Sequence, residues 1–234
     1  AMNIVLFEPD EIGKSLELSD ERAKHILNVL RRQEGDTFDA GVIDGKRGKA
    51  TLQSIGNESI ELQFDLRHEE PLLFPIDLIV GLSRPQTNRK ILQEATSMGV
   101  RSLSFVTTER AEPSYATSKL WTTGEWRRHV IAGVVQAFTT RMPKVSFGIG
   151  LEEALEASEN AEVKIALDNY EAESALSTID RSGDSIALAL GSERGWTGSE
   201  RQLLRAHHFR LAHLGSRPLR TETAAVAGIA VLLN

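Results

Sequence analysis

The spacing of apolar residues changes along the chain and separates a short first part from a longer second part. Near the start, apolar residues recur three or four positions apart and predict a short helix, through Ala23, Ile26, Leu27 and Leu30. Ser19 is expected to cap this helix, and Gly35 lies beyond its end as a natural stop. Three β-rich runs follow at 37–43, 48–55 and 59–66, with turn signals between them. We therefore expect a small antiparallel barrel.

The second part begins after the polar stretch 67–71, with a nearly continuous apolar run that is typical of a strand buried on both faces. From there, strands are expected at 76–82, 102–107, 145–149, 163–167, 186–190 and 210–214, and helices through 91–98, 126–138 and 151–157, from about 199, and at 223–233. This alternation predicts a parallel sheet covered by helices on both faces. We expect two domains, a β-barrel over residues 2–70 and an α/β domain over residues 72–234.

Composition narrows the classes of function. The net charge of −6 argues against a protein that coats nucleic acid without specificity, but it leaves room for a local basic face. No apolar stretch approaches the ~18 residues that a membrane helix needs, so a cytoplasmic location is expected. The absence of cysteine excludes disulfides and thiolate zinc sites. No metal is expected from His207, His208 and His213, because their separations do not put two ligands on one helical face.

The first candidate for a functional loop is 190–196, which directly follows a predicted strand, where ligands bind in open parallel sheets. Gly191 and Gly195 bracket it, so a ligand could approach its backbone closely. Turns of this kind also occur in many α/β proteins that bind no ligand there. Trp196 ends the loop and, like Trp121 and Trp126, is expected to anchor a core or an interface.

The second candidate, 214–225, is more specific, because a strand ends at a glycine and a helix begins only after a long turn. Capping by Thr221 and the charge of Glu222 would explain the start of the helix at Thr221 or Glu222. Neither residue explains Arg217 and Arg220, which therefore point to a role beyond helix capping.

Residues 214–225 resemble the closing motif of the ribosomal RNA small-subunit methyltransferase E family, a member of the SPOUT superfamily. The similarity extends over nearly the whole chain. Further matching positions lie in the opening helix and barrel entry, in two helices of the second part, and in the glycine-rich loop: His25, Val29, Leu30, Arg31, Gly35, Asp36, Met98, Gly99, Val100, Gln136, Arg141, Pro143, Gly191, Glu193 and Gly195.

The resemblance implies a PUA-like β-barrel, followed by a SPOUT α/β domain with a parallel sheet and a C-terminal trefoil knot, and a homodimer. It implies methyl transfer from S-adenosylmethionine to N3 of a uridine in 16S ribosomal RNA, with that RNA or the small ribosomal subunit as the partner. The residues expected to bind the cofactor come from the two late loops: Leu190, Gly191, Glu193, Gly195, Leu214, Gly215, Leu219, Arg220, Thr221, Glu222 and Thr223.

Methylation of uracil N3 needs loss of its proton and stabilisation of the anionic ring, because the neutral nitrogen is a poor nucleophile. Arg220 is the candidate for this catalytic role, although it could also brace its loop or pair with Glu222. Glu193 could hold the cofactor or orient its own loop. The residues expected to contact RNA are mostly cations: Arg31, Arg32, Arg84, Arg89, Lys90, Arg127, Arg128, Gln136 and Arg141.

Several positions depart from the family's pattern. Ser192 and Arg194 stand where the glycine-rich loop usually has proline and a second central glycine. Other departures lie at positions implied to face RNA: Glu94, Ser97, Val135 and Thr139. Two alternatives therefore remain open, a SPOUT methyltransferase with a different RNA target and a relative that binds RNA without catalysis.

Overall fold

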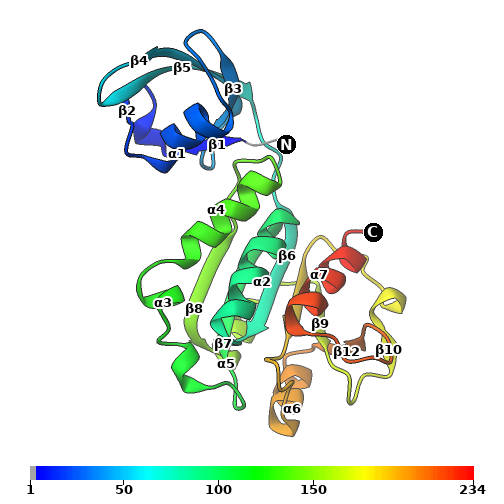
Figure 1. Cartoon of the computed structure of the whole chain (residues 1–234). Helices are drawn as coiled ribbons and strands as arrows, with labels where there is room; N and C mark the ends of the chain where they lie inside the picture. The colour runs from blue at the N-terminus through cyan, green and yellow to red at the C-terminus, as the bar shows by residue number, and fades with distance from the viewer. Residues whose placement is uncertain (1–3) are drawn as a thin grey trace. The chain divides into compact units, whose positions relative to one another are not determined.

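The computed structural model describes residues 4–234, so residues 2 and 3 of the expected first domain lie outside the described residues. The chain forms two compact units, shown in Figure 1. The first contains the residues up to Leu72 together with Val134–Met142, and the second contains Leu73–Gly133 and Pro143–Asn234.

The first unit is built around a five-stranded sheet in the order β1-β3-β4-β5-β2. Its strands are β1 (Val5–Phe7), β2 (Leu16–Glu17), β3 (Thr37–Val42), β4 (Arg47–Ile55) and β5 (Ser59–His68). The three expected runs are therefore confirmed as β3, β4 and β5, which pair antiparallel. The predicted antiparallel pairing holds for β3, β4 and β5, but it is wrong for β1, which pairs parallel with β3. Alternating residues of these strands, such as Phe38, Ala40, Ala50, Leu52 and Ile60, bury one face as a core.

The helix predicted near the start is α1 (Glu21–Lys24), which continues into a π-helix, η2 (His25–Val29). Asp20 caps it instead of Ser19, because the Asp20 carboxylate accepts a hydrogen bond from the Arg22 backbone N–H at 2.7 Å. The helix also ends before Gly35, since Arg31 adopts a left-handed conformation with φ 52°.

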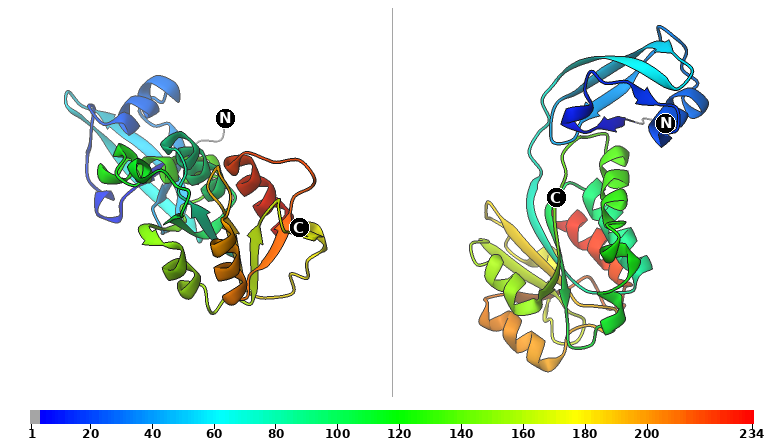
Figure 2. Two further views of the ribbon diagram at one scale, coloured as in Figure 1. Left: turned by 90° about the horizontal axis from the view of Figure 1, so that it is seen from below. Right: turned by 90° about the vertical axis from the view of Figure 1, so that its left-hand side faces the viewer.

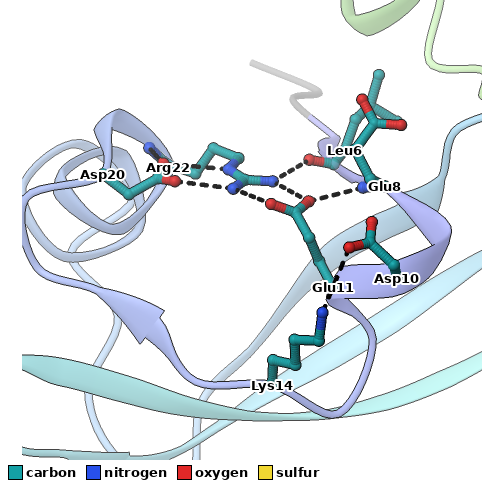
Figure 3. Close-up of polar contacts among 7 residues, drawn as sticks. All are labelled: Leu6, Glu8, Asp10, Glu11, Lys14, Asp20 and Arg22. Atoms are coloured by element: carbon teal, nitrogen blue, oxygen red, sulfur yellow. Dashed lines mark hydrogen bonds and ion pairs between the residues drawn. The ribbon is translucent and has the colours of Figure 1, made fainter.

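Arg22 fastens this helix to the preceding chain. Its guanidinium donates to both oxygens of Glu11, at 2.6 and 2.7 Å, and to both oxygens of Asp20, at 3.1 and 2.7 Å. Figure 3 shows these bonds together with the one to the Leu6 carbonyl oxygen, which is 3.2 Å long. Hydrogen bonds to Arg22 hold the pKa values of Glu11 and Asp20 below their usual range. A 3-10 turn, η1 (Pro9–Glu11), presents Glu11 to this arginine.

The returning segment Val134–Met142 completes the first unit. The hydroxyl of Thr139 donates to the buried Glu70 carboxylate at 2.5 Å, and Arg47 forms an ion pair with the same carboxylate. Arg141 donates to the carbonyl oxygens of Asp44 and Glu70, both at 3.2 Å. Hydrogen bonds therefore connect this later segment to the turn between β3 and β4 and to the residues that follow β5.

The second unit contains a seven-stranded sheet in the order β10-β12-β9-β11-β6-β7-β8, in which every pair is parallel. Its strands are β6 (Phe74–Gly81), β7 (Val100–Thr107), β8 (Lys144–Gly150), β9 (Val163–Leu167), β10 (Ser174–Ala175), β11 (Ile186–Leu190) and β12 (Arg210–His213). Six of them confirm the expected strands, and the two-residue edge strand β10 was not anticipated from the sequence.

Helices cover both faces of this sheet, as the alternating pattern predicts. They are α2 (Pro85–Ser97), α3 (Lys119–Thr122), α4 (Trp126–Gln136), α5 (Leu151–Ala157), α6 (Gly198–Ala206) and α7 (Thr221–Leu232), with 3-10 turns η3 (Pro113–Tyr115) and η4 (Leu176–Thr178). Figure 2 shows α5 and α6 on one face of the sheet and α2 and α7 on the other. Gly228 permits a close contact of α7 with the sheet, since a Cβ there would lie 3.1 Å from Leu188 Cδ2.

Candidate active site

The carboxyl ends of three neighbouring strands, β9, β11 and β12, surround a cavity of about 190 Å³ in the second unit. The start of α7 closes it. The lining residues come from four segments: Leu167, Asp168, Asn169, Tyr170, Leu190, Gly191, Ser192, Glu193, Arg194, Gly195, Trp196, Leu214, Pro218, Leu219, Thr221 and Ala224. Because ligands of parallel sheets bind at this edge, the cavity is the primary candidate for a functional site.

The loop after β11 lies against the end of β6, and glycine makes this approach possible. A Cβ at Gly81 would lie only 2.4 Å from the Ser192 backbone nitrogen. A Cβ at Gly191 would lie 3.0 Å from the backbone of Gly195, which itself has φ 65°. The two glycines of this loop therefore permit a tight turn, and its backbone lines the cavity.

Glu193 braces this loop against the start of α2. Its carboxylate accepts hydrogen bonds from the Arg84 backbone N–H at 2.9 Å and from the Thr87 hydroxyl at 3.4 Å. Arg84 is the residue that precedes α2, so the carboxylate lies at the positive end of that helix. Of the two roles expected for Glu193, these contacts support orientation of its own loop.

Trp196 ends the loop as a fully buried side chain whose indole N–H donates to the Leu167 carbonyl oxygen at 3.0 Å. Trp121 is buried as well, at 5 % exposure. Trp126 is partly buried and packs near Phe147, with ring centroids 6.0 Å apart. The indole of Trp196 thus connects the end of β9 to the end of the glycine-rich loop.

The loop after β12 supplies Leu214, Pro218 and Leu219 to the cavity. Helix α7 starts at Thr221, one of the two starts expected from this loop and two residues before the apolar run 223–233. Gly215 has φ 116°, which favours glycine, but it does not line the cavity. Thr223 is exposed and does not line it either. Gly215 and Thr223 were both expected to bind the cofactor, and neither is among the residues that line the cavity.

A second, more open groove of about 800 Å³ adjoins this cavity and shares Glu193, Pro218, Leu219 and Thr221 with it. Its remaining lining residues are Arg84, Gln86, Thr87, Lys90, Arg220 and Glu222. Arg220 and Glu222, expected to bind the cofactor, thus lie on the groove instead of lining the cavity. Three cationic side chains border it, which suits a polyanionic ligand.

Glu222 is paired in this groove with Lys90, whose ammonium nitrogen lies 3.2 Å from the carboxylate. Burial raises the pKa of Glu222, but its own backbone N–H and Lys90 outweigh that effect and hold the pKa below its usual range. The alternative of an Arg220–Glu222 pair is therefore not what the described residues form. Arg220 is exposed and immediately precedes α7.

The cations expected to contact RNA occupy different environments. Arg31 and Arg84 are exposed, and Arg32 is partly buried. Arg89 forms two hydrogen bonds to Glu125, at 2.7 and 3.2 Å. Arg141 donates to backbone carbonyl oxygens within the first unit. Arg128 lies 3.7 Å from Glu125, and Gln136 is exposed at the end of α4. Arg89 and Arg141 thus carry structural contacts that RNA binding would have to share.

The loop after β9 was missed by the sequence reasoning, although it contributes Leu167, Asp168, Asn169 and Tyr170 to the cavity. The signal that could have found it is its position after a buried strand, since the rule applied to the two later loops applies equally here. Among residues 4–234, no cluster of histidine and carboxylate side chains is placed to hold a metal ion. No helix in the same range is long and apolar enough to cross a membrane.

Comparison with known proteins places this arrangement in a family. An RNA methyltransferase domain model matches residues 68–233, and an RNA methyltransferase PUA domain model matches residues 18–65. The ribosomal RNA small subunit methyltransferase E of Treponema pallidum is 36% identical, and the match covers 99% of this chain and 91% of that protein. The ribosomal RNA small subunit methyltransferase E 1 of Borreliella burgdorferi is 29% identical, and the match covers 97% of this chain and 95% of that protein.

A solved structure agrees with these sequence matches. The ribosomal RNA small subunit methyltransferase E of Neisseria gonorrhoeae, bound to S-adenosyl methionine, is 30% identical. It superposes with a TM-score of 0.76 over 98% of this chain and 96% of that one. The α/β fold with a parallel sheet, preceded by a PUA domain, is thereby confirmed, and the chain belongs to the ribosomal RNA small subunit methyltransferase E family of RNA methyltransferases.

Proposed function

We propose that this protein methylates ribosomal RNA of the small subunit with S-adenosylmethionine, and that its target atom is N3 of a uridine in 16S ribosomal RNA. The observation that carries this proposal is the cavity at the ends of β9, β11 and β12, which opens beside a groove bordered by Arg84, Lys90 and Arg220. A donor site next to a cationic acceptor site is what methyl transfer to a polyanion requires.

The lining of the cavity fits the cofactor. Leucine side chains such as Leu214 and Leu219 offer apolar surface for an adenine, while the glycine-rich loop offers backbone groups. Ser192 is 6 % exposed, and its hydroxyl has no hydrogen-bond partner within the described residues, so it is available to a ligand. When bound, S-adenosylmethionine supplies an electrophilic methyl group.

The protein's task is then to hold the nucleophile in line and to favour its anionic form. Arg220 lies on the groove at the start of α7, where its charge adds to the positive end of the helix. We assign Arg220 the role of stabilising negative charge on the uracil ring. Lys90 is partly occupied by Glu222 and is the weaker candidate.

The first test separates binding from transfer. Calorimetric titration of S-adenosylmethionine into Arg220→Ala should give an affinity within about threefold of the unmodified protein, while methyl transfer to small subunits lacking the modification falls ~100-fold. Arg220→Lys, which keeps the charge, should retain more of the transfer rate. Equal transfer by all three proteins would remove Arg220 from catalysis.

The target atom needs its own measurement. Digestion of the methylated ribosomal RNA to nucleosides and mass spectrometry should yield 3-methyluridine. A different methylated nucleoside would support the alternative of another RNA target, for which Arg194 on the cavity lining is the specific observation. Cofactor binding without transfer to any RNA would support the alternative of a binding protein that has lost turnover.

The proposed function also includes the roles of the two domains, the trefoil knot and the assembly state. We propose that residues 2–70 form a module that docks RNA and that 72–234 form the methyltransferase domain, with a trefoil knot built around the two late loops. We also propose a homodimer acting in the cytoplasm, where ribosomal RNA is the substrate. Sedimentation equilibrium of the purified protein tests the homodimer, and a monomer mass would overturn it.

A further inference from the structure

The loop after β9 is held by a buried ion pair that the mechanism above does not use. The Asp168 side chain is 2 % exposed and the Arg201 side chain 9 % exposed, and Arg201 Nε lies 2.8 Å from Asp168 Oδ2. The other Asp168 oxygen accepts the backbone N–H groups of Tyr170 at 2.8 Å and Glu171 at 2.6 Å. Asp168 therefore determines the path of the loop 168–171.

Arg201 reaches two further residues of the same loop. Its Nη1 atom lies 3.5 Å from a Glu171 carboxylate oxygen, and its guanidinium lies over the Tyr170 ring, 5.2 Å from the centroid. Arg205, one turn further along α6, holds the second Glu171 oxygen at 2.7 Å. Helix α6 thus fixes both ends of the short segment that contains Tyr170.

Tyr170 is held in place and yet exposed. It is 78 % exposed, it lines the cavity, and its ring edge lies near the glycine-rich loop, where a Cβ at Gly195 would be 3.8 Å from Tyr170 Cε2. Since the guanidinium of Arg201 covers one face of the ring, the other face remains available to a ligand. A large exposed aromatic ring fixed at the mouth of a cavity has the geometry of a stacking surface.

We propose that Tyr170 is a cofactor-binding residue that stacks on the adenine of S-adenosylmethionine, and that Arg201 is a positioning residue that acts through it. This inference rests on the proposed function. A contact with the sulfonium is disfavoured, because a second cation on the ring would face the guanidinium of Arg201 across the same π-system. A neutral, flat adenine has no such penalty, and stacking on an aromatic ring tolerates it.

The free-energy cost of burying Asp168 and Arg201 supports a role for this loop in ligand binding. A buried ion pair commonly adds little to stability compared with apolar residues of similar volume, since both charges lose their hydration. Asp168 and Arg201 nevertheless direct their hydrogen bonds to the one loop of the cavity that carries an exposed aromatic ring.

Three ligands distinguish a contact with the adenine from a contact with the sulfonium: S-adenosylmethionine, S-adenosylhomocysteine and adenosine. All three contain adenine, but only the first has a sulfonium. Calorimetry should show that Tyr170→Ala weakens all three by a similar factor, about tenfold or more, while Tyr170→Phe binds like the unmodified protein. Tyr115→Ala is the matched control, because Tyr115 is the other tyrosine of the chain and does not line the cavity. A loss confined to S-adenosylmethionine, or no loss, would overturn the assignment to adenine.

The positioning of Tyr170 by Arg201 through Glu171 is tested at Glu171, because its side chain is 42 % exposed and its substitution leaves the buried pair of Asp168 and Arg201 intact. Glu171→Gln should weaken cofactor binding a few-fold with an unchanged unfolding temperature, and it should have no further effect when Tyr170 is already alanine. Additive losses would contradict action through Tyr170. If the unmodified protein bound no S-adenosylmethionine, the proposed function itself would fail, whereas binding unaffected by Tyr170→Ala removes only this inference.

Discussion

Individual backbone atoms at the active site leave no room for a side chain at certain positions. The clearest case is Gly81 at the end of β6, where an added Cβ would meet the Ser192 nitrogen at 2.4 Å and the Gly191 carbonyl carbon at 2.8 Å. Both neighbours are backbone atoms, so they cannot rotate away as a flexible side chain would. The position of the glycine-rich loop therefore depends on a residue more than a hundred positions earlier in the chain.

Gly81→Ala should displace this loop and weaken S-adenosylmethionine binding by about tenfold or more, with a destabilisation of ~1–3 kcal/mol from overpacking. Calorimetry and thermal unfolding measure the two effects. Gly198→Ala is the matched control, because a Cβ there meets nothing within 4 Å and Gly198 begins helix α6, where alanine is favourable. Equal behaviour of the two variants would contradict the role of Gly81.

Glu193 offers a second prediction at the residue scale. Because its carboxylate accepts the Arg84 backbone N–H, Glu193→Gln should keep an acceptor oxygen there and preserve cofactor affinity within a few-fold, whereas Glu193→Ala should weaken it by ~1–2 kcal/mol. Calorimetric affinities of the two variants decide the matter. A large loss in Glu193→Gln would instead indicate that the negative charge contacts the cofactor.

At the scale of elements, Arg22 joins helix α1, η1 and β1 through five side-chain hydrogen bonds. Glu11 and Asp20 are 31% and 28% exposed, so solvent screens these bonds only in part. Their pKa values are lowered in the folded chain, and each carboxylate therefore stabilises the fold above its unfolded pKa and loses that contribution as the pH falls through the folded pKa.

Arg22→Met should destabilise the first unit by ~1–3 kcal/mol at neutral pH, and the difference from the unmodified chain should shrink below about pH 4. Every tryptophan and tyrosine lies in the second unit, so fluorescence would not report this change. Hydrogen exchange of the β1 and α1 amides, read by mass spectrometry, measures it locally. A difference that stays constant from neutral to acidic pH would rule out the carboxylates as its source.

The element scale also shows what the sequence could predict. Buried parallel strands such as β9 and β11 were predicted with their observed bounds, because continuous apolar runs between turn signals leave few alternatives. The three-residue β1 and two-residue β2 and β10 carry too few positions for a period to be recognised. The sequence predicts Ser19 as the helix cap, one residue before the observed cap Asp20, because serine and aspartate are about equally favourable at this position. The hydrogen bonds between Asp20 and Arg22, which distinguish the two, are seen only in the structure.

The sequence also predicts some parts of the candidate site, while others depend on the tertiary fold. The two late loops could be located from their glycines and their place after strands, and the structure brings them to one cavity. The loop that carries Tyr170 could be located by the same rule, but the role of the tyrosine could not, because the contact of Arg201 with its ring depends on the tertiary fold. The groove that contains Arg220 and Lys90 joins residues 130 positions apart, and this requires the tertiary fold.

At the scale of the whole molecule, the proposed binding to RNA, a polyanion, has to occur despite a net charge of −6. Many of the cations are engaged with carboxylates, as Arg89 is with Glu125, which holds the pKa of Glu125 at about 2. RNA binding should therefore depend on a few local cations and show a shallow response to salt.

Arg84→Ala should lower RNA affinity and reduce the slope of log K against log salt concentration by about 0.7, the contribution of one phosphate contact with single-stranded nucleic acid. Titration of labelled small-subunit RNA at several salt concentrations gives both quantities. Arg210→Ala is the control, because Arg210 begins β12 and so lies at the strand end opposite to the cavity. An equal change of slope in both variants would show that only overall charge matters.

The return of residues 134–142 to the first unit has a consequence for biosynthesis. A ribosome that has released the first 72 residues has not yet made Thr139 and Arg141, which satisfy Glu70 and the carbonyl of Asp44. The amino-terminal unit therefore cannot reach its final form until roughly twice that length has emerged and part of the later sheet has been synthesised. The unit whose translation begins first is therefore completed only after part of the second unit has been made.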